Sequence, residues 1–360
     1  WPGDPRLDVG LRPAERRDAG GWPFSGGGER PSGSGGADGG PVWPSGGRGP
    51  AGEPRFDAPV PTGGYLWWYL DALSDDGQYG LTIIAFVGSV FSPYYAWARR
   101  GGAHTNPDNF CALNVALYSR HARRWTMTER GAAHNQRDRT HFKIGPSQLR
   151  WNGDSLVIDI DEVGVPLPRR VRGRIQVHPM QLFQFSTPLD AAGRHRWGPL
   201  APQARVEVDL SLPEQRWRGQ AYLDSNEGDE PIDRAFTEWD WSRSLLSDGS
   251  TAVLYDLEPG RDDGRLLALR FGTDGEVTPF DAPPQKELPR TAWRLARRLR
   301  SDGPVTVHEQ LEDTPFYQRA ALRHSLLGET VTCFHETLHV PRLVSPVVQA
   351  MLPWRMPRRT

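Results

Sequence analysis

The chain has 360 residues, which is enough for one large domain or two modest ones. Lys and Arg total 43 against 44 for Asp and Glu, so charge gives no reason to expect nucleic acid as a partner. The best candidate for a membrane-spanning helix, residues 81–98, is interrupted by glycine, serine and proline, which argues against a span. Both cysteines, Cys111 and Cys333, lie in apolar strand-like runs and are expected to be buried free thiols.

Residues 1–54 contain 25 Gly or Pro and no sustained apolar period. Such a segment cannot bury enough surface to offset its chain entropy, so we predict a disordered tail. It also lacks the apolar centre of a secretory signal peptide, and export is therefore not expected.

Residues 63–98 concentrate aromatic and β-branched residues around one turn. A ring-rich run at 65–69, a Ser-Asp-Asp-Gly turn at 74–77 and a strand-like run at 81–87 together predict a β-hairpin. Strands so rich in rings suit a wide apolar pocket. We expect the lining of this pocket to include Trp67, Trp68, Phe91, Tyr94 and Tyr95.

The rest of the chain is dominated by period-two alternation, as in residues 156–161 and 206–210. Asn-Gly and Asp-Gly dipeptides recur between such runs and favour hairpin turns. The pattern predicts half-buried antiparallel strands arranged as barrels or sandwiches. Helix evidence is thin: residues 291–300 fit either a basic amphipathic helix or a twisted edge strand.

A zinc-protease string, His-Glu-Thr-Leu-His, occupies residues 335–339. Its chemistry needs a helix, which sets two histidines four residues apart on one face. The flanking residues instead favour a strand, in which the two histidines would stand about 13 Å apart and could not share one zinc ion. We therefore expect strand histidines and no metal. Nucleotide-binding and serine-hydrolase motifs are absent from the sequence, so no cofactor is indicated.

Two acidic positions could carry acid–base chemistry. Tyr222 and Asp224 are two residues apart and would share one face of a strand, whereas Leu223 would point the other way. An acid in an apolar, ring-lined pocket stays protonated near neutral pH and can donate a proton to an alkene. Without further information, a turn-side Asp that bonds its own loop is the more common arrangement. Asp256 is the reserve acid.

Residues 63–98 and six later strings in the chain resemble the carotenoid 1,2-hydratase (hydroxyneurosporene synthase) family, in the family's order. The resemblance extends from about Phe56 to the C-terminus and leaves out the Gly- and Pro-rich tail. The strings are CALNVALY (111–118), RWTMTERG (124–131), IGPS (144–147), YLDSN (222–226), WDWSR (239–243) and QAMLPWRMPR (349–358).

The resemblance implies an all-β fold of two lipocalin-like antiparallel β-barrels with few short helices. We place the domains at residues 1–54 (tail), 55–245 and 246–360. It also implies a cofactor-independent hydro-lyase that adds water to the terminal C1–C2 double bond of acyclic carotenoids such as neurosporene or lycopene, giving 1-hydroxy carotenoids.

By the same resemblance, Asp224 is the proton donor, and Trp197 and Tyr222 stabilise the tertiary carbocation that follows. Trp239 and Trp241 are expected to line the pocket. The implied partners are the carotenoid, water and membrane surface lipids. The protein should then lie on the cytoplasmic side of a bacterial membrane, docked through residues 290–300 or 351–359.

Two other functions are consistent with the same ring-rich, all-β sequence. A ring-lined barrel would also serve a non-catalytic carrier of apolar ligands. The 14 tryptophans could instead form stacking platforms on the surface of a carbohydrate-binding module. Turnover of a carotenoid separates the hydratase from the carrier, and affinity for glycans identifies the binding module.

Overall fold

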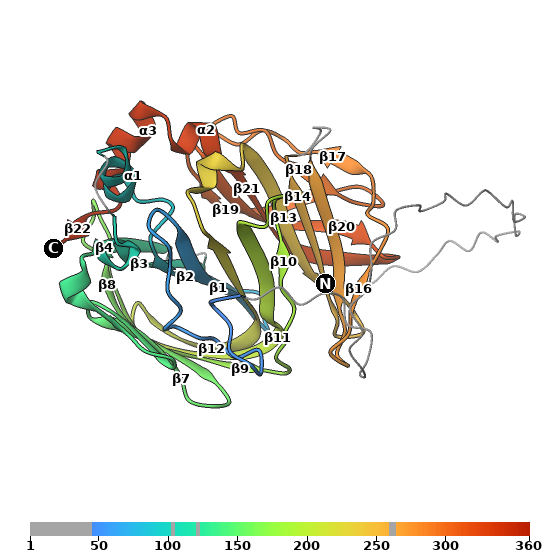
Figure 1. Cartoon of the computed structure of the whole chain (residues 1–360). Coiled ribbons are helices and arrows are strands. Elements are labelled where there is room, and N and C mark those ends of the chain that lie inside the picture. Colours follow the sequence, from blue (N-terminus) through green and yellow to red (C-terminus); the bar gives the residue numbers. More distant parts are fainter. Residues whose placement is uncertain (1–44, 102–104, 120–122, 259–263) are drawn as a thin grey trace, which may run out of the picture. The chain divides into compact units, whose positions relative to one another are not determined.

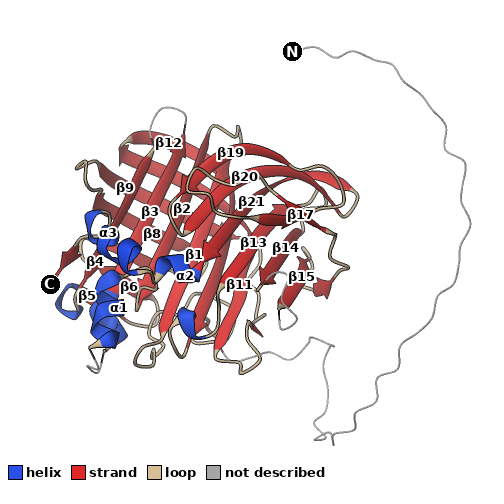
Figure 2. Ribbon diagram, turned by 90° about the horizontal axis from the view of Figure 1, so that it is seen from above, coloured by secondary structure: helices blue, strands red, loops and turns tan. Residues whose placement is uncertain are grey.

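The computed structural model describes residues 45–101, 105–119, 123–258 and 264–360. They form two large sheets and one small two-stranded sheet, with short helices gathered at one edge (Figures 1 and 2). The all-β expectation is confirmed. No helix among these residues has the length and apolar character needed to cross a bilayer.

The first sheet has 13 strands in the order β22-β4-β3-β2-β1-β12-β11-β9-β8-β7-β6-β5, with β10 paired to β11. All its ladders are antiparallel except that of β22 with β4. The strands are β1 (Tyr65–Ser74), β2 (Tyr79–Val87), β3 (Cys111–Ser119), β4 (Arg124–Arg130), β5 (Asn135–Arg137), β6 (His141–Ile144), β7 (Ser147–Trp151), β8 (Leu156–Val163), β9 (Arg170–Pro179), β10 (Thr187–Pro188), β11 (His195–Leu212), β12 (Glu214–Gly228) and β22 (Arg358–Arg359).

The second sheet has seven strands in the order β16-β15-β14-β13-β21-β20-β19, and β17 pairs with β18. Its strands, with those of the small sheet, are β13 (Glu238–Leu245), β14 (Thr251–Leu257), β15 (Arg265–Phe271), β16 (Val277–Pro279), β17 (Gln285–Glu287), β18 (Arg298–Arg300), β19 (Thr306–Asp313), β20 (Tyr317–Leu326) and β21 (Glu329–His339). The α-helices are α1 (Pro93–Arg100), α2 (Val340–Leu343) and α3 (Pro346–Met351), and the 3₁₀ turns are η1 (Pro107–Phe110), η2 (Ala132–His134), η3 (Ile232–Arg234) and η4 (Leu352–Trp354).

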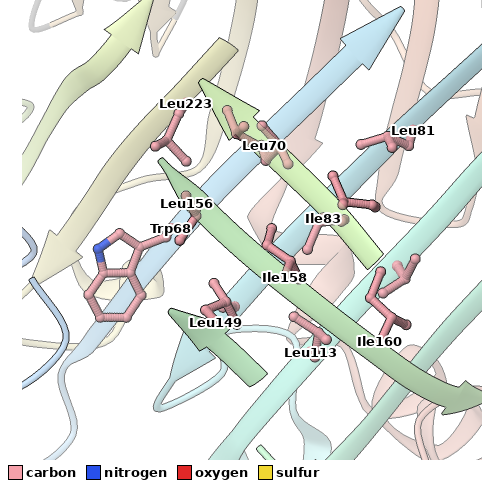
Figure 3. Packing of buried hydrophobic residues seen from close by; sticks show 14 of the residues in the cluster. Trp68, Leu70, Leu81, Ile83, Leu113, Leu149, Leu156, Ile158, Ile160 and Leu223 are labelled. Atoms are coloured by element: carbon pink, nitrogen blue, oxygen red, sulfur yellow. The ribbon is translucent and has the colours of Figure 1, made fainter. Parts of the chain in front are cut away.

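Alternation along β1 and β12 separates two hydrophobic cores. Leu66, Trp68 and Leu70 point into a core made by the first sheet and the segment before β1, and the sheet curls so that β7 and β8 lie over β1 to β3 (Figure 3). Trp67 and Tyr69 point the other way, into a second core that also takes side chains from the second sheet. Successive strand residues face opposite sides, so one strand serves both cores.

A buried ion pair joins the two sheets. Arg243 of β13 donates from Nε to Asp71 Oδ1 of β1 at 2.9 Å, and a second contact from its Nη2 reaches the same oxygen. Neither side chain is more than 7% exposed. The Arg243 guanidinium also lies over the Phe334 ring, 5.0 Å from its centroid. This pair holds β1 and β13 together inside the second core.

Three expectations need correction or restatement. Residues 45–54 are not a disordered tail: Arg48 is buried and donates to the carbonyl oxygens of Gly198 and Pro199, while residues 1–44 lie outside the described residues. Residues 291–297 form a loop and only Arg298–Arg300 a short strand, so the helix alternative is wrong. The third expectation is the pair of β-barrels, which is not confirmed. Within the described residues, no ladder joins the two ends of either large sheet.

The division at residue 245 stays a prediction. It falls in the turn between β13 and β14, which are neighbours in the second sheet. The zinc-protease string lies on β21, as expected, and the described residues contain no group of three or more metal-binding side chains. Cys111 and Cys333 are free and buried, which confirms that expectation.

Candidate active site

Asp224 is held by two donors on one of its oxygens. The Trp197 indole Nε1–H donates to Asp224 Oδ2 at 2.9 Å, and the Tyr222 hydroxyl donates to the same oxygen at 3.0 Å. The pairing of β11 with β12 sets Trp197 beside Asn226 and thereby brings the indole to the acid. Among the described residues, none hydrogen-bonds Oδ1. With Oδ2 fixed as an acceptor, a proton on this carboxyl group belongs on Oδ1.

Burial is the main electrostatic influence on this acid. Removal from water raises the pKa of Asp224 to about 8, because the charged form loses its hydration. The hydrogen bonds from Trp197 and Tyr222 oppose this rise, and the nearby charges of Glu336 and Asp71 add to it. Burial therefore favours the protonated form of Asp224.

Asp224 faces a narrow cavity of about 50 Å³ between the two sheets. A space of this size can hold water where polar groups are available to bind it. Its walls are mostly aromatic rings and aliphatic side chains, drawn from β1, β2, β11 and β12 of the first sheet and from β13, β14, β20 and β21 of the second. The lining residues are Trp67, Tyr69, Ile84, Phe86, Phe91, Trp197, Asp224, Asn226, Trp239, Trp241, Tyr255, Tyr317, Glu336 and Leu338.

A second carboxyl group, that of Glu336 on β21, lines the same cavity. Its Oε1 accepts from Arg319 Nε at 2.7 Å and from the Tyr69 hydroxyl at 2.6 Å. Arg319 is buried and also donates to Glu312 Oε1 at 2.7 Å. Within the described part of the chain, Glu336 Oε2 has no hydrogen-bond partner.

A larger cavity of about 340 Å³ adjoins the first, with Ile84, Phe91 and Tyr317 in the walls of both. Its other walls come from β3, β4, the end of β19, the 314–316 turn, the C-terminal helices with Met351, and the 291–297 loop with Trp293. The larger, outer cavity and the smaller, inner one thus share wall residues, and Asp224 lines only the inner cavity.

The structure brings together most of the residues that the sequence suggested. Trp197, Tyr222 and Asp224 are in direct contact, and Trp67, Phe91, Trp239 and Trp241 line the inner cavity. The cavity lies between the sheets and not inside one curled sheet, whose interior is filled by aliphatic and aromatic side chains.

Four suggested residues lie elsewhere. Trp68 packs against Phe56 in the core of the first sheet, since it follows Trp67 and must face the opposite side. Tyr94 packs against Trp97, and the Tyr95 hydroxyl donates to the Gly64 carbonyl oxygen; both belong to α1. Asp256 accepts from Arg300 Nε at 2.8 Å on the far face of β14.

Sequence reasoning missed Tyr69, Asn226, Tyr255 and Glu336. Alternation from Trp67 and Asp224 would have placed Tyr69 and Asn226 on the cavity side. Glu336 had no such signal, because it belongs to a metal-binding string that was rejected and because the pairing of β13 with β21 is not readable from local pattern.

Comparison with known proteins places the chain among the hydro-lyases. It is 57% identical over 361 residues to the acyclic carotenoid 1,2-hydratase of Rubrivivax gelatinosus, covering 99% of this chain and 89% of the relative. The enzyme of the same name from Thiocapsa roseopersicina is 53% identical, with 99% and 88% covered. A family model described as carotenoid hydratase CrtC matches residues 83–360. The chain belongs to the carotenoid hydratase family.

Both relatives align over almost all of this chain, so the similarity includes the Gly- and Pro-rich segment before Phe56. The expectation that it stops there is wrong. Among solved structures, a protein of Nitrosomonas europaea provisionally named AttH matches with a TM-score of 0.56 and 17% identity, covering 76% of this chain and 92% of that one. This match supports the fold alone.

Proposed function

We propose that the protein hydrates the terminal C1–C2 double bond of an acyclic carotenoid such as neurosporene or lycopene, by acid catalysis and without a cofactor. The observation that carries the proposal is the buried Asp224 carboxyl group, with both of its donors on Oδ2, facing a ring-lined cavity. Incubation of the purified protein with lycopene in liposomes tests it. We expect a product heavier by one water molecule, and unchanged lycopene would favour an apolar-ligand carrier.

In this mechanism the polyene extends from the outer cavity into the inner one, with its terminal double bond at Asp224. The acid donates its Oδ1 proton to C2, and a tertiary cation forms at C1. The Trp197 ring, which lines the cavity, and the Tyr222 ring, which lies beside Asp224, stabilise that cation, with about 2 kcal/mol expected for a desolvated cation–π contact. Water then attacks C1, and the 1-hydroxy carotenoid leaves along the path by which the substrate entered.

The rate should fall as pH rises through about 8, because Asp224 must be protonated to act. Replacing Trp197 with Phe removes a hydrogen bond that lowers the pKa of Asp224. In Trp197→Phe the fall should therefore begin at a higher pH, while the maximal rate drops. Measuring kcat/KM of the wild type and of Trp197→Phe on both sides of pH 8 checks this prediction. If the two pH profiles coincide, the fall in rate belongs to the titration of another group.

We propose that the protein docks on a bilayer through the rim of the outer cavity, on the cytoplasmic side of the membrane. The two docking segments inferred from the sequence meet there, since Trp293 and Met351 line the same cavity. Val347 and Trp354, at 71% and 76% exposure, stand on the adjoining helices. Arg355 lies beside them, over the Trp125 ring. Exposed apolar tips with arginines suit a lipid interface.

Replacing Trp354 with Ser should weaken binding to anionic liposomes by about tenfold, which corresponds to roughly 1.4 kcal/mol. Leu167→Ser is the matched control, because Leu167 is 63% exposed in the turn between β8 and β9 and lines neither cavity. Cosedimentation with liposomes measures both. Equal loss in the two variants would show that the rim is not the docking surface.

For the fold, we propose that the protein consists of two lipocalin-like units and that each large sheet forms one incomplete barrel. Curling of the first sheet around its own core supports this for that sheet. The second core, shared by both sheets, gives them a common ligand cavity.

A further inference from the structure

The two carboxyl groups of the inner cavity are held in the same way. Asp224 receives two donors on Oδ2, and Glu336 receives two donors on Oε1. In each, the described residues leave the other oxygen without a hydrogen bond. They differ in electrostatics: Asp224 contacts neutral donors, whereas Glu336 forms an ion pair with the buried Arg319. The contrast suits Asp224 to the role of acid and Glu336 to that of a base.

We propose that Glu336 is a second catalytic residue, which binds the attacking water and accepts its proton. This inference rests on the proposed hydration. A base must lie where water can reach it and where the substrate cation forms. Glu336 meets both conditions, because it lines the cavity that holds Asp224 and comes from the opposite sheet.

The step balances as follows. The Asp224 O–H bond breaks, and the π electrons of the C1–C2 double bond form a new C–H bond at C2, which leaves a cation at C1. A water lone pair forms the C–O bond at C1 while one water proton passes to Glu336 Oε2. Asp224 is then a carboxylate and Glu336 an acid. Transfer of that proton back to Asp224, through water in the cavity, restores both groups.

The proposal predicts a particular defect in Glu336→Gln. The cation should still form, but without a base it returns to alkene by giving a proton back to Asp224. In D₂O the recovered carotenoid should therefore carry deuterium, and the ratio of exchange to hydration should rise. Hydration should fall about 10²- to 10⁴-fold, the usual contribution of a general base. A purely structural role would lower exchange and hydration together and leave their ratio unchanged.

Glu162→Gln is the matched control. It removes a carboxylate from another buried arginine, Arg130, but lines neither cavity, so its ratio of exchange to hydration should equal that of the wild type. Glu336→Asp keeps a carboxylate for Arg319 and guards against misfolding; its shorter side chain should still raise the ratio.

Mass spectrometry of carotenoid recovered from D₂O reads both quantities. A wild-type ratio in Glu336→Gln and Glu336→Asp would overturn the role of Glu336 while leaving the hydratase intact. Absence of product from the wild-type protein would instead overturn the proposed function.

Discussion

Asp224→Asn should abolish hydration of lycopene, with a fall of about 10²- to 10⁴-fold or more, because the amide cannot deliver the proton that starts the reaction. Deuterium exchange into recovered carotenoid should disappear as well, since no cation forms. Chromatography and mass analysis of matched incubations measure both. Equal product from wild type and variant would keep the reaction but assign its acid elsewhere.

The same variant should fold at least as stably as the wild type. The pKa of Asp224 is raised to about 8 in the folded protein from an ordinary value of 3.8. Its contribution to stability is therefore complete below about pH 3.8 and is lost as pH rises through about 8, because the unfolded chain ionises first. Asn does not ionise and avoids this loss. Thermal unfolding at pH 8 should give a higher Tm for Asp224→Asn, which separates lost chemistry from lost structure.

Among the substitutions predicted for this protein, those that break the buried Asp71–Arg243 pair between the sheets should cause the largest loss of stability. Asp71→Asn leaves the Arg243 guanidinium without its charge partner in a site where neither side chain is more than 7% exposed. Loss of one partner of a buried pair typically costs about 3–5 kcal/mol. Urea unfolding followed by tryptophan fluorescence would report the free energy of unfolding.

Two comparisons make this result interpretable. The exposed pair of Arg205 and Asp75 serves as control, and Asp75→Asn should cost far less stability than Asp71→Asn, because solvent screens an exposed pair. The double variant Asp71→Asn with Arg243→Met should be more stable than the sum of the single losses predicts, since no charge remains buried and unpaired. Additive losses would mean that the two side chains stabilise the protein independently.

The local sequence pattern was enough to predict the strands and which side chains share a strand face. Alternation and resemblance together placed Tyr222 and Asp224 on one face, and the hairpin from β1 to β2 was readable from its turn. The sequence did not reveal that the cavity lies between two sheets, because that depends on which strands meet at long range. Trp68 was assigned to the cavity because the whole ring-rich run was expected to line it, although alternation sets Trp68 opposite Trp67. Glu336 could not be paired with Asp224 without knowing the position of β21.

The two faces of β1 separate the residues that line the cavity from those that hold the first sheet together. Trp67 and Tyr69 face the cavity between the sheets, while Leu66, Trp68 and Leu70 pack in the core of the first sheet. Under the proposed function, substitutions of the first set should change which polyene is accepted, whereas substitutions of the second set should change stability. A library restricted to the cavity-facing positions would then alter substrate choice without disturbing the core of the first sheet.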